Sequence, residues 1–428
     1  MDIEKLALYG GPKSIKEPFE RYNSIGQEEI DAVKTVIESG VLSQFLGCWS
    51  PDFYGGAKVQ EFERACEQYF NVKHAISVNS WTSGLIAAVG AIGIQPGDEV
   101  IVPPWTMCAS ATAILQWNAI PVFADIDPET FCLDPISVEA NISPYTKAIM
   151  AVDIFGQSAD INSLMGIAEK YGLKVISDTA QAPGALYKGK MAGTLAHIGG
   201  FSLNYHKHIH TGEGGVLVTN DDEMAERLQL IRNHAEAVVA DKGVENLTNM
   251  LGFNFRLGEI ESAIGIEQLK KLTHFISSRQ HAAERLGQGL EGLIGLKTPV
   301  VRDNCTHVYY IYPLILDIDR IGVSRTKIIE ALEAEGLMGL AAGYSNVHLL
   351  PMYQQKIAYG SSGFPWSSDI CRREVSYAKG ICPVAEKMND STYIGFAMCM
   401  HQLGDKELDS ISLAFRKVWA NLDLLKFA

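Results

Sequence analysis

The sequence has few features typical of a secreted, membrane-bound or nucleic-acid-binding protein. Its 428 residues include eight cysteines with no Cys-x-x-Cys pair, a pattern typical of reduced cytosolic thiols rather than of a disulfide framework. No apolar run approaches the ~18 residues of a membrane span. The 36 Lys and Arg are outnumbered by 50 Asp and Glu, for a net charge of −14, which argues against binding along nucleic acid or an anionic membrane. We therefore predict a cytoplasmic protein with no nucleic-acid or membrane partner.

A regular alternation of strand and helix patterns is present instead. Short apolar runs predict strands, and amphipathic or apolar helical stretches lie between most of them. The predicted strands are 75–78, 99–103, 120–124, 147–152, 174–177, 200–203 and 215–219. This order predicts an α/β fold in which helices flank a mostly parallel sheet.

The chain is longer than one typical domain of roughly 100 to 200 residues. A helix is predicted over 161–171, started by Asp160 and Asn162 and stopped by Gly172. The pattern is helical from about 222 to 281, and new strand and helix signals follow at 308–316 and 327–336. We predict an N-terminal arm and large domain in residues 1–280 and a smaller α/β domain in residues 281–428.

One lysine lies between a predicted strand and a glycine-rich turn. Lys207 follows the strand 200–203 and precedes Gly212-Glu213-Gly214-Gly215. A partly neutral lysine forms a Schiff base with a carbonyl compound, and pyridoxal phosphate is the commonest cofactor held in this way. Asp178 ends the strand 174–177, where a carboxylate at the carboxyl edge of the sheet could hold the pyridine nitrogen.

A candidate phosphate site follows the first predicted strand. Asn79-Ser80-Trp81-Thr82-Ser83-Gly84 opens a helical run, and the free amides at a helix N-terminus bind phosphate. The alternative is that Thr82 and Ser83 only cap the helix. Because Lys207 and Asp178 occur in the same chain, we interpret the segment as the phosphate site of the cofactor.

These landmarks together resemble the DegT/StrS type of sugar aminotransferase family. The similar blocks, in order along nearly the whole chain, are 97–103, 119–135, 176–185, the Lys207 region and 252–256. The resemblance implies a fold-type I transferase that depends on pyridoxal phosphate, with a large domain and a smaller C-terminal α/β domain. It also implies transfer of an amino group from glutamate or glutamine to a keto-sugar, nucleotide-linked in the first instance, in amino-sugar biosynthesis.

The resemblance further implies a role for each matching residue. Lys207 would bind the cofactor covalently and shuttle the proton, Asp178 would hold the pyridine nitrogen, and Gln181 would approach the phenolic oxygen. The phosphate contacts would be Thr82, Ser83 and Ser202, with Asn254 supplied by the neighbouring subunit. A homodimer with shared active sites is therefore implied.

Three alternatives stay open. The first is an aminotransferase that acts on a cyclitol ketone resembling scyllo-inosose. Another is a keto-sugar dehydratase, although such relatives carry histidine where this chain has Lys207. The third is a non-catalytic regulatory relative. His206, His208 and His210 alternate and could be drawn as a metal triad on a strand, but no Asp or Cys accompanies them in the segment, and no metal site is predicted.

Several positions depart from the pattern of the family. Trp81 stands where relatives usually have glycine, and Asp153 stands where they often have histidine. Met107 occupies the place of the aromatic residue that stacks on the pyridine ring; its thioether could pack there, or Trp105 or Trp81 could replace it. Further candidates for the substrate cleft are His234, Tyr344 and His348.

Overall fold

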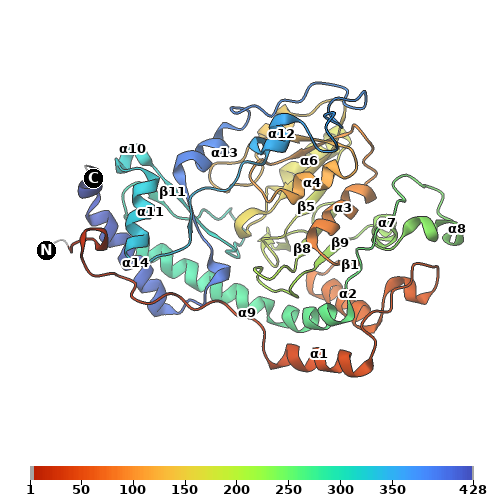
Figure 1. Ribbon diagram of the computed structural model, residues 1–428, viewed down its shortest axis with the longest axis horizontal. Helices are drawn as coiled ribbons and strands as arrows, with labels where there is room; N and C mark the ends of the chain where they lie inside the picture. The colour runs from red at the N-terminus through yellow and green to blue at the C-terminus, as the bar shows by residue number, and fades with distance from the viewer. Residues whose placement is uncertain (1–3, 427–428) are drawn as a thin grey trace.

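Two β-sheets joined by one long helix organise the chain (Figure 1). The structure, a computed structural model, describes residues 4–426. The larger sheet has seven strands in the order β1-β9-β8-β5-β4-β2-β3, and a second sheet has four in the order β10-β11-β13-β12. Helix α9, Glu259–Leu290, runs from one to the other. The predicted α/β class, with a mostly parallel sheet and a smaller C-terminal unit, is confirmed.

All seven predicted strands are present, with ends that differ by at most two residues. Six run parallel, and β9 alone is reversed between β1 and β8. Their bounds are β1 His74–Val78, β2 Glu99–Val102, β3 Ile120–Phe123, β4 Thr146–Val152, β5 Lys174–Asp178, β8 Ile198–Ser202 and β9 Gly215–Thr219. Because parallel strands end at the same edge of a sheet, the loops after β1, β2, β4, β5 and β8 lie together.

Helices cover both faces of this sheet. Alternate residues of a strand point to opposite faces. Leu217 therefore packs in one core with α3 (Trp81–Ala91) and α7 (Asp222–Arg232), whereas Val216 and Val218 pack in another with α2 (Ala57–Phe70) and α9. The helices of this part are α1 Gln27–Ser39, α2 Ala57–Phe70, α3 Trp81–Ala91, α4 Ala109–Leu115, α5 Pro135–Ala140, α6 Ile161–Tyr171, α7 Asp222–Arg232 and α8 Val239–Lys242. A small hairpin joins β6 Leu186–Tyr187 to β7 Lys190–Met191.

Helix α6 has the bounds that the sequence predicts. The Asp160 side chain accepts hydrogen bonds from the amide and the hydroxyl of Ser163, and Gly172 ends the helix in the left-handed region, with a φ of 66°. A side-chain cap at the start and a glycine at the end each satisfy backbone groups that the helix leaves unpaired.

The bridge between the sheets differs from its prediction. The chain is not continuously helical over 222–281, since a loop separates α8 from α9, and α9 continues beyond residue 280 to Leu290. The predicted strand 308–316 is shorter, with β11 limited to Tyr312–Leu316, because Tyr309 takes a φ of 52° that an extended strand does not allow. The division of the chain at residue 280 stays a prediction.

The second sheet is built mainly from the C-terminal third. Its strands are β10 Leu296–Lys297, β11, β12 Leu340–Ala341 and β13 Tyr393–Phe396, and the helices of this third are α10 Ile318–Ile321, α11 Arg325–Ala334, α12 Pro351–Gln355, α13 Pro383–Lys387, α14 Asp405–Ala420 and α15 Leu422–Lys426. The N-terminal arm belongs to this unit, since Leu6 and Ile15 lie in its core. Conversely, part of the C-terminal third belongs to the large sheet, since its core includes Val347, Tyr353 and Tyr377.

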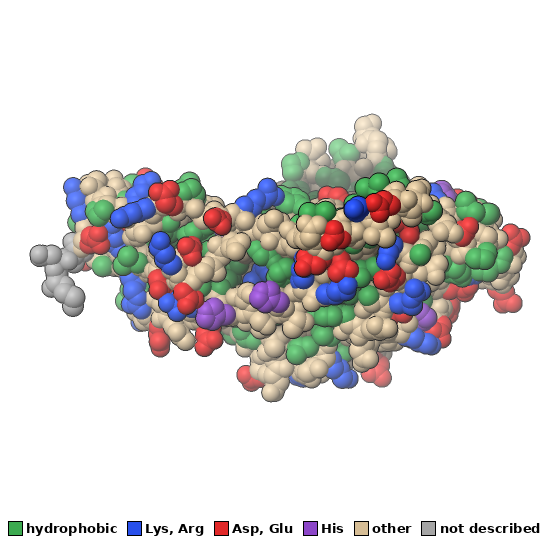
Figure 2. All heavy atoms as spheres, turned by 90° about the horizontal axis from the view of Figure 1, so that it is seen from below, with side chains coloured by type: hydrophobic (Ala, Val, Ile, Leu, Met, Phe, Trp, Pro, Cys, Tyr) green, Lys and Arg blue, Asp and Glu red, His purple; other side chains and the backbone are tan. Residues whose placement is uncertain are grey.

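The surface is charged with both signs. Figure 2 shows acidic and basic side chains interspersed over one face of the molecule. Within residues 4–426, no helix combines the length and the apolar character needed to cross a bilayer.

Candidate active site

The structure brings four of the predicted residues to the carboxyl edge of the large sheet. Asp178 is the last residue of β5 and Ser202 the last of β8. Helix α3, which begins at Trp81 and contains Thr82 and Ser83, follows β1 at the same edge. Such an edge, where loops leave parallel strands, is where α/β proteins bind their ligands.

Lys207 lies in the loop between β8 and β9 with its amine enclosed. The residue is 8% exposed, and Nζ lies 4.3 Å from the centroid of the Tyr310 ring. Burial lowers the pKa of Lys207 to about 8, although the negative charge of Asp178 acts in the opposite direction. Within residues 4–426, no carboxylate lies at ion-pair distance from this amine. The lysine is therefore partly neutral near pH 8, as an attacking amine must be.

The Asp178 carboxylate is held by donors on both oxygens. The indole Nε1 of Trp81 donates to Oδ1 at 2.7 Å, and the Ser110 hydroxyl donates to Oδ2 at 2.7 Å. The backbone amide of Ala180 adds a longer contact of 3.3 Å to Oδ1. The carboxylate therefore has a defined orientation, and Oδ2, with a single donor, keeps a lone pair for a further donor.

The orientation of the Gln181 amide follows from its neighbours. Oε1 accepts a hydrogen bond from the backbone amide of Phe155 at 2.8 Å, which only an oxygen can do. Nε2 therefore occupies the other side and donates to the Tyr344 hydroxyl at 3.2 Å. The second N–H of this amide is free to donate to an oxygen acceptor such as a phenolate. Tyr344, predicted as a cleft residue, thus contacts a predicted site residue.

Ser80 caps the start of α3. The alternative to a phosphate site was that Thr82 and Ser83 only cap this helix, but the cap is Ser80. The Ser80 hydroxyl oxygen accepts a hydrogen bond from the Ser83 amide at 3.0 Å, and the Ser83 hydroxyl donates to Asn79 Oδ1 at 2.7 Å. The amides of Trp81 and Thr82 open the helix, so no earlier helical carbonyl faces them. These amides, with the Thr82 hydroxyl, suit a phosphate.

Three more predicted residues differ in their exposure to solvent: Met107 and Asn254 are exposed, and Trp105 is buried. Met107 is 58% exposed just before α4. Trp105 is fully buried among Phe131 and other aromatic rings. Asn254 is exposed, and its Oδ1 accepts a hydrogen bond from Arg256 Nε at 2.8 Å. Its carbonyl also accepts a 3.3 Å hydrogen bond from Asn79 of the same chain, so Asn254 lies beside the start of α3.

Asp153, which departs from the family pattern, and His348, a predicted cleft residue, both make contacts inside the protein. Asp153 is buried and accepts hydrogen bonds from the Thr179 hydroxyl and the Ala159 amide, and burial raises its pKa to about 7. His348 does not face a cleft, because it is fully buried and contacts Glu386 at 3.0 Å.

The remaining histidines do not form a cluster. The predicted strand 200–203 ends at Ser202, so the segment that follows is a series of turns rather than an extended strand. His208 is buried with Nε2 at 2.8 Å from the Val308 carbonyl, and His234 lies beside the backbone of Gly252. Burial and the charge of Lys207 lower the pKa of His206 to about 4, so it is neutral. No three His, Cys, Asp or Glu between residues 4 and 426 are arranged to hold a metal ion.

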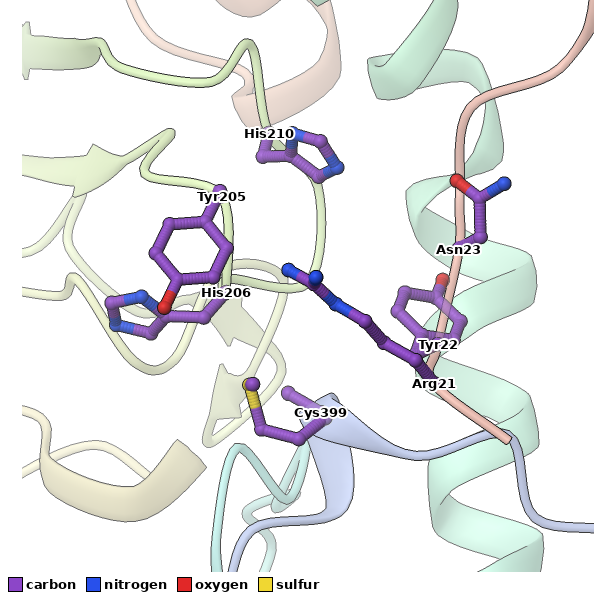
Figure 3. A pocket seen from close by; sticks show the side chains of 8 residues that line it. Arg21, Tyr22, Asn23, Tyr205, His206, His210 and Cys399 are labelled. Carbon is purple, nitrogen blue, oxygen red and sulfur yellow. The ribbon is translucent and has the colours of Figure 1, made fainter. Parts of the chain in front are cut away.

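A cavity of about 280 Å³ lies beside the lysine loop (Figure 3). Arg21 extends into it from the N-terminal arm, between Cys399 and the loop that carries Tyr205 and His210. Its guanidinium lies 5.7 Å from the centroid of the Tyr205 ring. In the part of the chain that the structure describes, no carboxylate is at ion-pair distance from Arg21. No motif marks Arg21 in the sequence, since it precedes the lysine segment by a long stretch of chain.

Solved structures share this architecture. The chain superposes on an aminotransferase from Psychrobacter cryohalolentis with a TM-score of 0.79 and 27% identity, over 95% of this chain and 100% of that one.

Relatives of two kinds are similar in sequence. The chain is 38% identical to GDP-perosamine synthase of Caulobacter vibrioides, over 70% of this chain and 79% of the relative. It is 33% identical to the L-glutamine:2-deoxy-scyllo-inosose aminotransferase of Streptomyces kanamyceticus, over 82% of this chain and 83% of the relative.

The family profile and these relatives agree with the resemblance read from the sequence. Residues 23–392 match the DegT/DnrJ/EryC1/StrS aminotransferase family. The protein is therefore a pyridoxal-phosphate-dependent transaminase that acts on a sugar or a cyclitol. The chain belongs to the DegT/DnrJ/EryC1/StrS aminotransferase family.

Proposed function

We propose that the protein transfers an amino group from glutamate or glutamine to a nucleotide-linked keto-sugar in amino-sugar biosynthesis. The observation that carries the proposal is the buried amine of Lys207 beside the oriented carboxylate of Asp178. A lysine at this position supports transamination over dehydration. The 38% identity to GDP-perosamine synthase supports a nucleotide-linked acceptor, and the cationic cavity at Arg21 suits its phosphates. A cyclitol ketone is the second candidate, supported by the inosose aminotransferase relative.

The residues at the sheet edge fit pyridoxal phosphate. Asp178 would hold the pyridine nitrogen, and the free N–H of Gln181 would donate to the phenolic oxygen. The phosphate would lie at the start of α3, against Thr82, Ser83 and, from β8, Ser202. When bound, the cofactor supplies the electron sink that stabilises negative charge at the donor α-carbon and carries the amino group.

Lys207 would do the proton chemistry. Its buried amine first holds the cofactor covalently. With an amino acid in its place, the neutral Nζ would accept the proton from the donor α-carbon and return it to the cofactor carbon on the other side of the transferred nitrogen. The acceptor half of the reaction runs these proton movements in reverse. His206 is neutral beside it and therefore adds no charge that would oppose a protonated Lys207.

The active form would be a homodimer. Leu46, Trp49, Leu247 and Leu251 are 41–61% exposed, and we call them the apolar rim. Their two loops meet at residues 233–234, where Asn233 donates to the Leu46 carbonyl and the His234 amide to the Phe253 carbonyl. Asn254 lies in one of these loops, so a second copy placed on the rim would bring its Asn254 toward this site.

Replacement of Lys207 by alanine tests the proposal. We expect the variant to keep its fold and lose turnover by several orders of magnitude, because it lacks both the covalent anchor and the proton carrier. Amino-sugar product is measured by mass spectrometry with glutamate or glutamine as donor and a nucleotide-linked keto-hexose or an inosose as acceptor. Lys190→Ala, at an exposed lysine of β7, is the matched control. Undiminished turnover in Lys207→Ala would contradict the proposal, and turnover with inosose alone would favour the second candidate.

A further inference from the structure

The indole of Trp81 lies between the start of helix α3 and strand β8, where it reaches Asp178 at the end of β5. Trp81 is the first residue of α3 and is 6% exposed. Its Nε1 donates to Asp178 Oδ1 at 2.7 Å, a distance typical of a strong hydrogen bond to a charged acceptor.

Glycines make room for this ring. A Cβ on Gly200 of β8 would lie 2.4 Å from the indole atoms Cη2 and Cζ3, and one on Gly84 would lie 2.8 Å from Cε3. Both distances are far below van der Waals contact, so any larger side chain at Gly200 or Gly84 would displace the indole. The ring is therefore tightly held, and the direction of its N–H is set by packing.

A second donor completes the arrangement from another helix. Ser110 of α4 donates to Asp178 Oδ2 at 2.7 Å. Two side chains from two helices thus fix the plane of one carboxylate, and Oδ2 keeps a lone pair for a further donor. A carboxylate held in this way can meet a pyridine N–H without first losing rotational freedom.

We propose that Trp81 is a positioning residue, which orients Asp178 for the pyridine nitrogen of the cofactor; this rests on the cofactor site proposed above. Trp81 takes over an orienting task that the glycine usual at this position cannot perform. Ser110 is its counterpart on the other oxygen.

Trp81→Phe tests the proposal, because it keeps an aromatic ring in the glycine-lined space and removes only the N–H. Pyridoxal phosphate is titrated into the cofactor-free, full-length chain, and the absorption band of the bound cofactor is followed against pH. We expect the dissociation constant to rise about tenfold or more, the range for a lost hydrogen bond to a charged group, and the pH midpoint of the band to move. Ser110→Ala should weaken binding in the same sense.

Trp117→Phe is the matched control. Trp117 is also buried against α3, at Gly90, and its Nε1 also donates at 2.7 Å, but to the Ile86 carbonyl. We expect it to lower thermal stability as much as Trp81→Phe while leaving cofactor affinity within about twofold. Equal loss of affinity in both variants would mean a general packing effect and would overturn the proposal.

The Asp178→Asn background separates this inference from the proposed function. If Trp81 acts through Asp178, adding Trp81→Phe to Asp178→Asn should cause little further loss of affinity. A full additional loss would overturn the role of Trp81, as would wild-type affinity in the single variant. If Asp178→Asn alone left affinity and spectrum unchanged, the proposed cofactor site itself would be wrong.

Discussion

At the scale of residues, the burial of one amine, that of Lys207, sets the reactivity of the site. Lys207 is enclosed beneath the Tyr310 ring, and its folded-state pKa of about 8 lies below the ordinary value of 10.5. Only the neutral amine attacks a carbonyl, so its nucleophilic fraction grows as the pH rises through 8.

The first prediction concerns this pH dependence. The rate at which cofactor-free protein binds pyridoxal phosphate covalently should rise with pH and level off above about pH 8. Stopped-flow absorbance at the band of the bound cofactor measures this rate, and borohydride reduction with mass spectrometry confirms attachment at Lys207. A rate that continued to rise toward pH 10.5 would show that the amine is not desolvated as the structure describes.

The second prediction concerns Arg21. If its guanidinium binds an anionic group of a substrate, Arg21→Gln should raise the KM of that substrate about tenfold or more, the range for a lost charged hydrogen bond. Steady-state kinetics with each substrate varied in turn identify the group: a raised KM for the amino acid indicates its carboxylate, and a raised KM for the nucleotide-linked sugar indicates its phosphates. Arg64→Gln, at an exposed arginine of α2, is the control. Unchanged KM values for both substrates would exclude the cavity as a substrate site.

The sequence predicted part of this chemistry. Lys207, Asp178 and Ser202 could be placed together because each follows or ends a strand of one sheet. Ser110, Tyr310 and Arg21 could not, since each comes from a helix, loop or arm whose position depends on the tertiary fold. The sequence marked Trp81 only as a departure from glycine, because Gly200, which admits its ring, and Asp178, which accepts from its indole, are distant in the chain.

At the scale of elements, prediction succeeded where local signals agree. Strands buried on both faces appear as continuous apolar runs, and all seven were found. Helix α6 was found to the residue because both of its ends carry capping residues. Helix α9 was not, since the predicted helical pattern began near 222 and stopped at 281, while packing against α2 and α14 carries the helix to Leu290.

The third prediction is that the cap of α6 contributes to stability. Asp160 accepts hydrogen bonds from Ser163 and, at 2.6 Å, from the Tyr187 hydroxyl. Asp160→Ala should lower the free energy of unfolding by about 1–2 kcal/mol, as loss of an N-cap does, and thermal denaturation would record a lower Tm. Asp31→Ala, on the exposed side of α1, should have a much smaller effect. An unchanged Tm in Asp160→Ala would contradict the assigned cap.

At the scale of the whole molecule, the proposed homodimer would cover the exposed apolar rim. The fourth prediction is that Leu251→Glu, which places a charge on the rim, converts a dimer into monomers at micromolar concentration and lowers turnover with it. Light scattering coupled to size-exclusion chromatography measures the mass. Ile136→Glu, equally apolar and 79% exposed on α5, should leave the mass unchanged. A monomeric wild-type protein with full turnover would contradict the shared site.

The N-terminal arm has a consequence for synthesis of the chain. Its hydrogen-bonding partners are distant in sequence: the Ala7 amide donates to Glu335, and the Tyr22 amide donates to the Met400 carbonyl. A chain leaving the ribosome therefore exposes the arm, with apolar Leu6 and Ile15, long before the residues that cover it exist. The large sheet can pair its strands during translation, whereas Arg21 reaches its place beside the lysine loop only after almost the entire chain has been made.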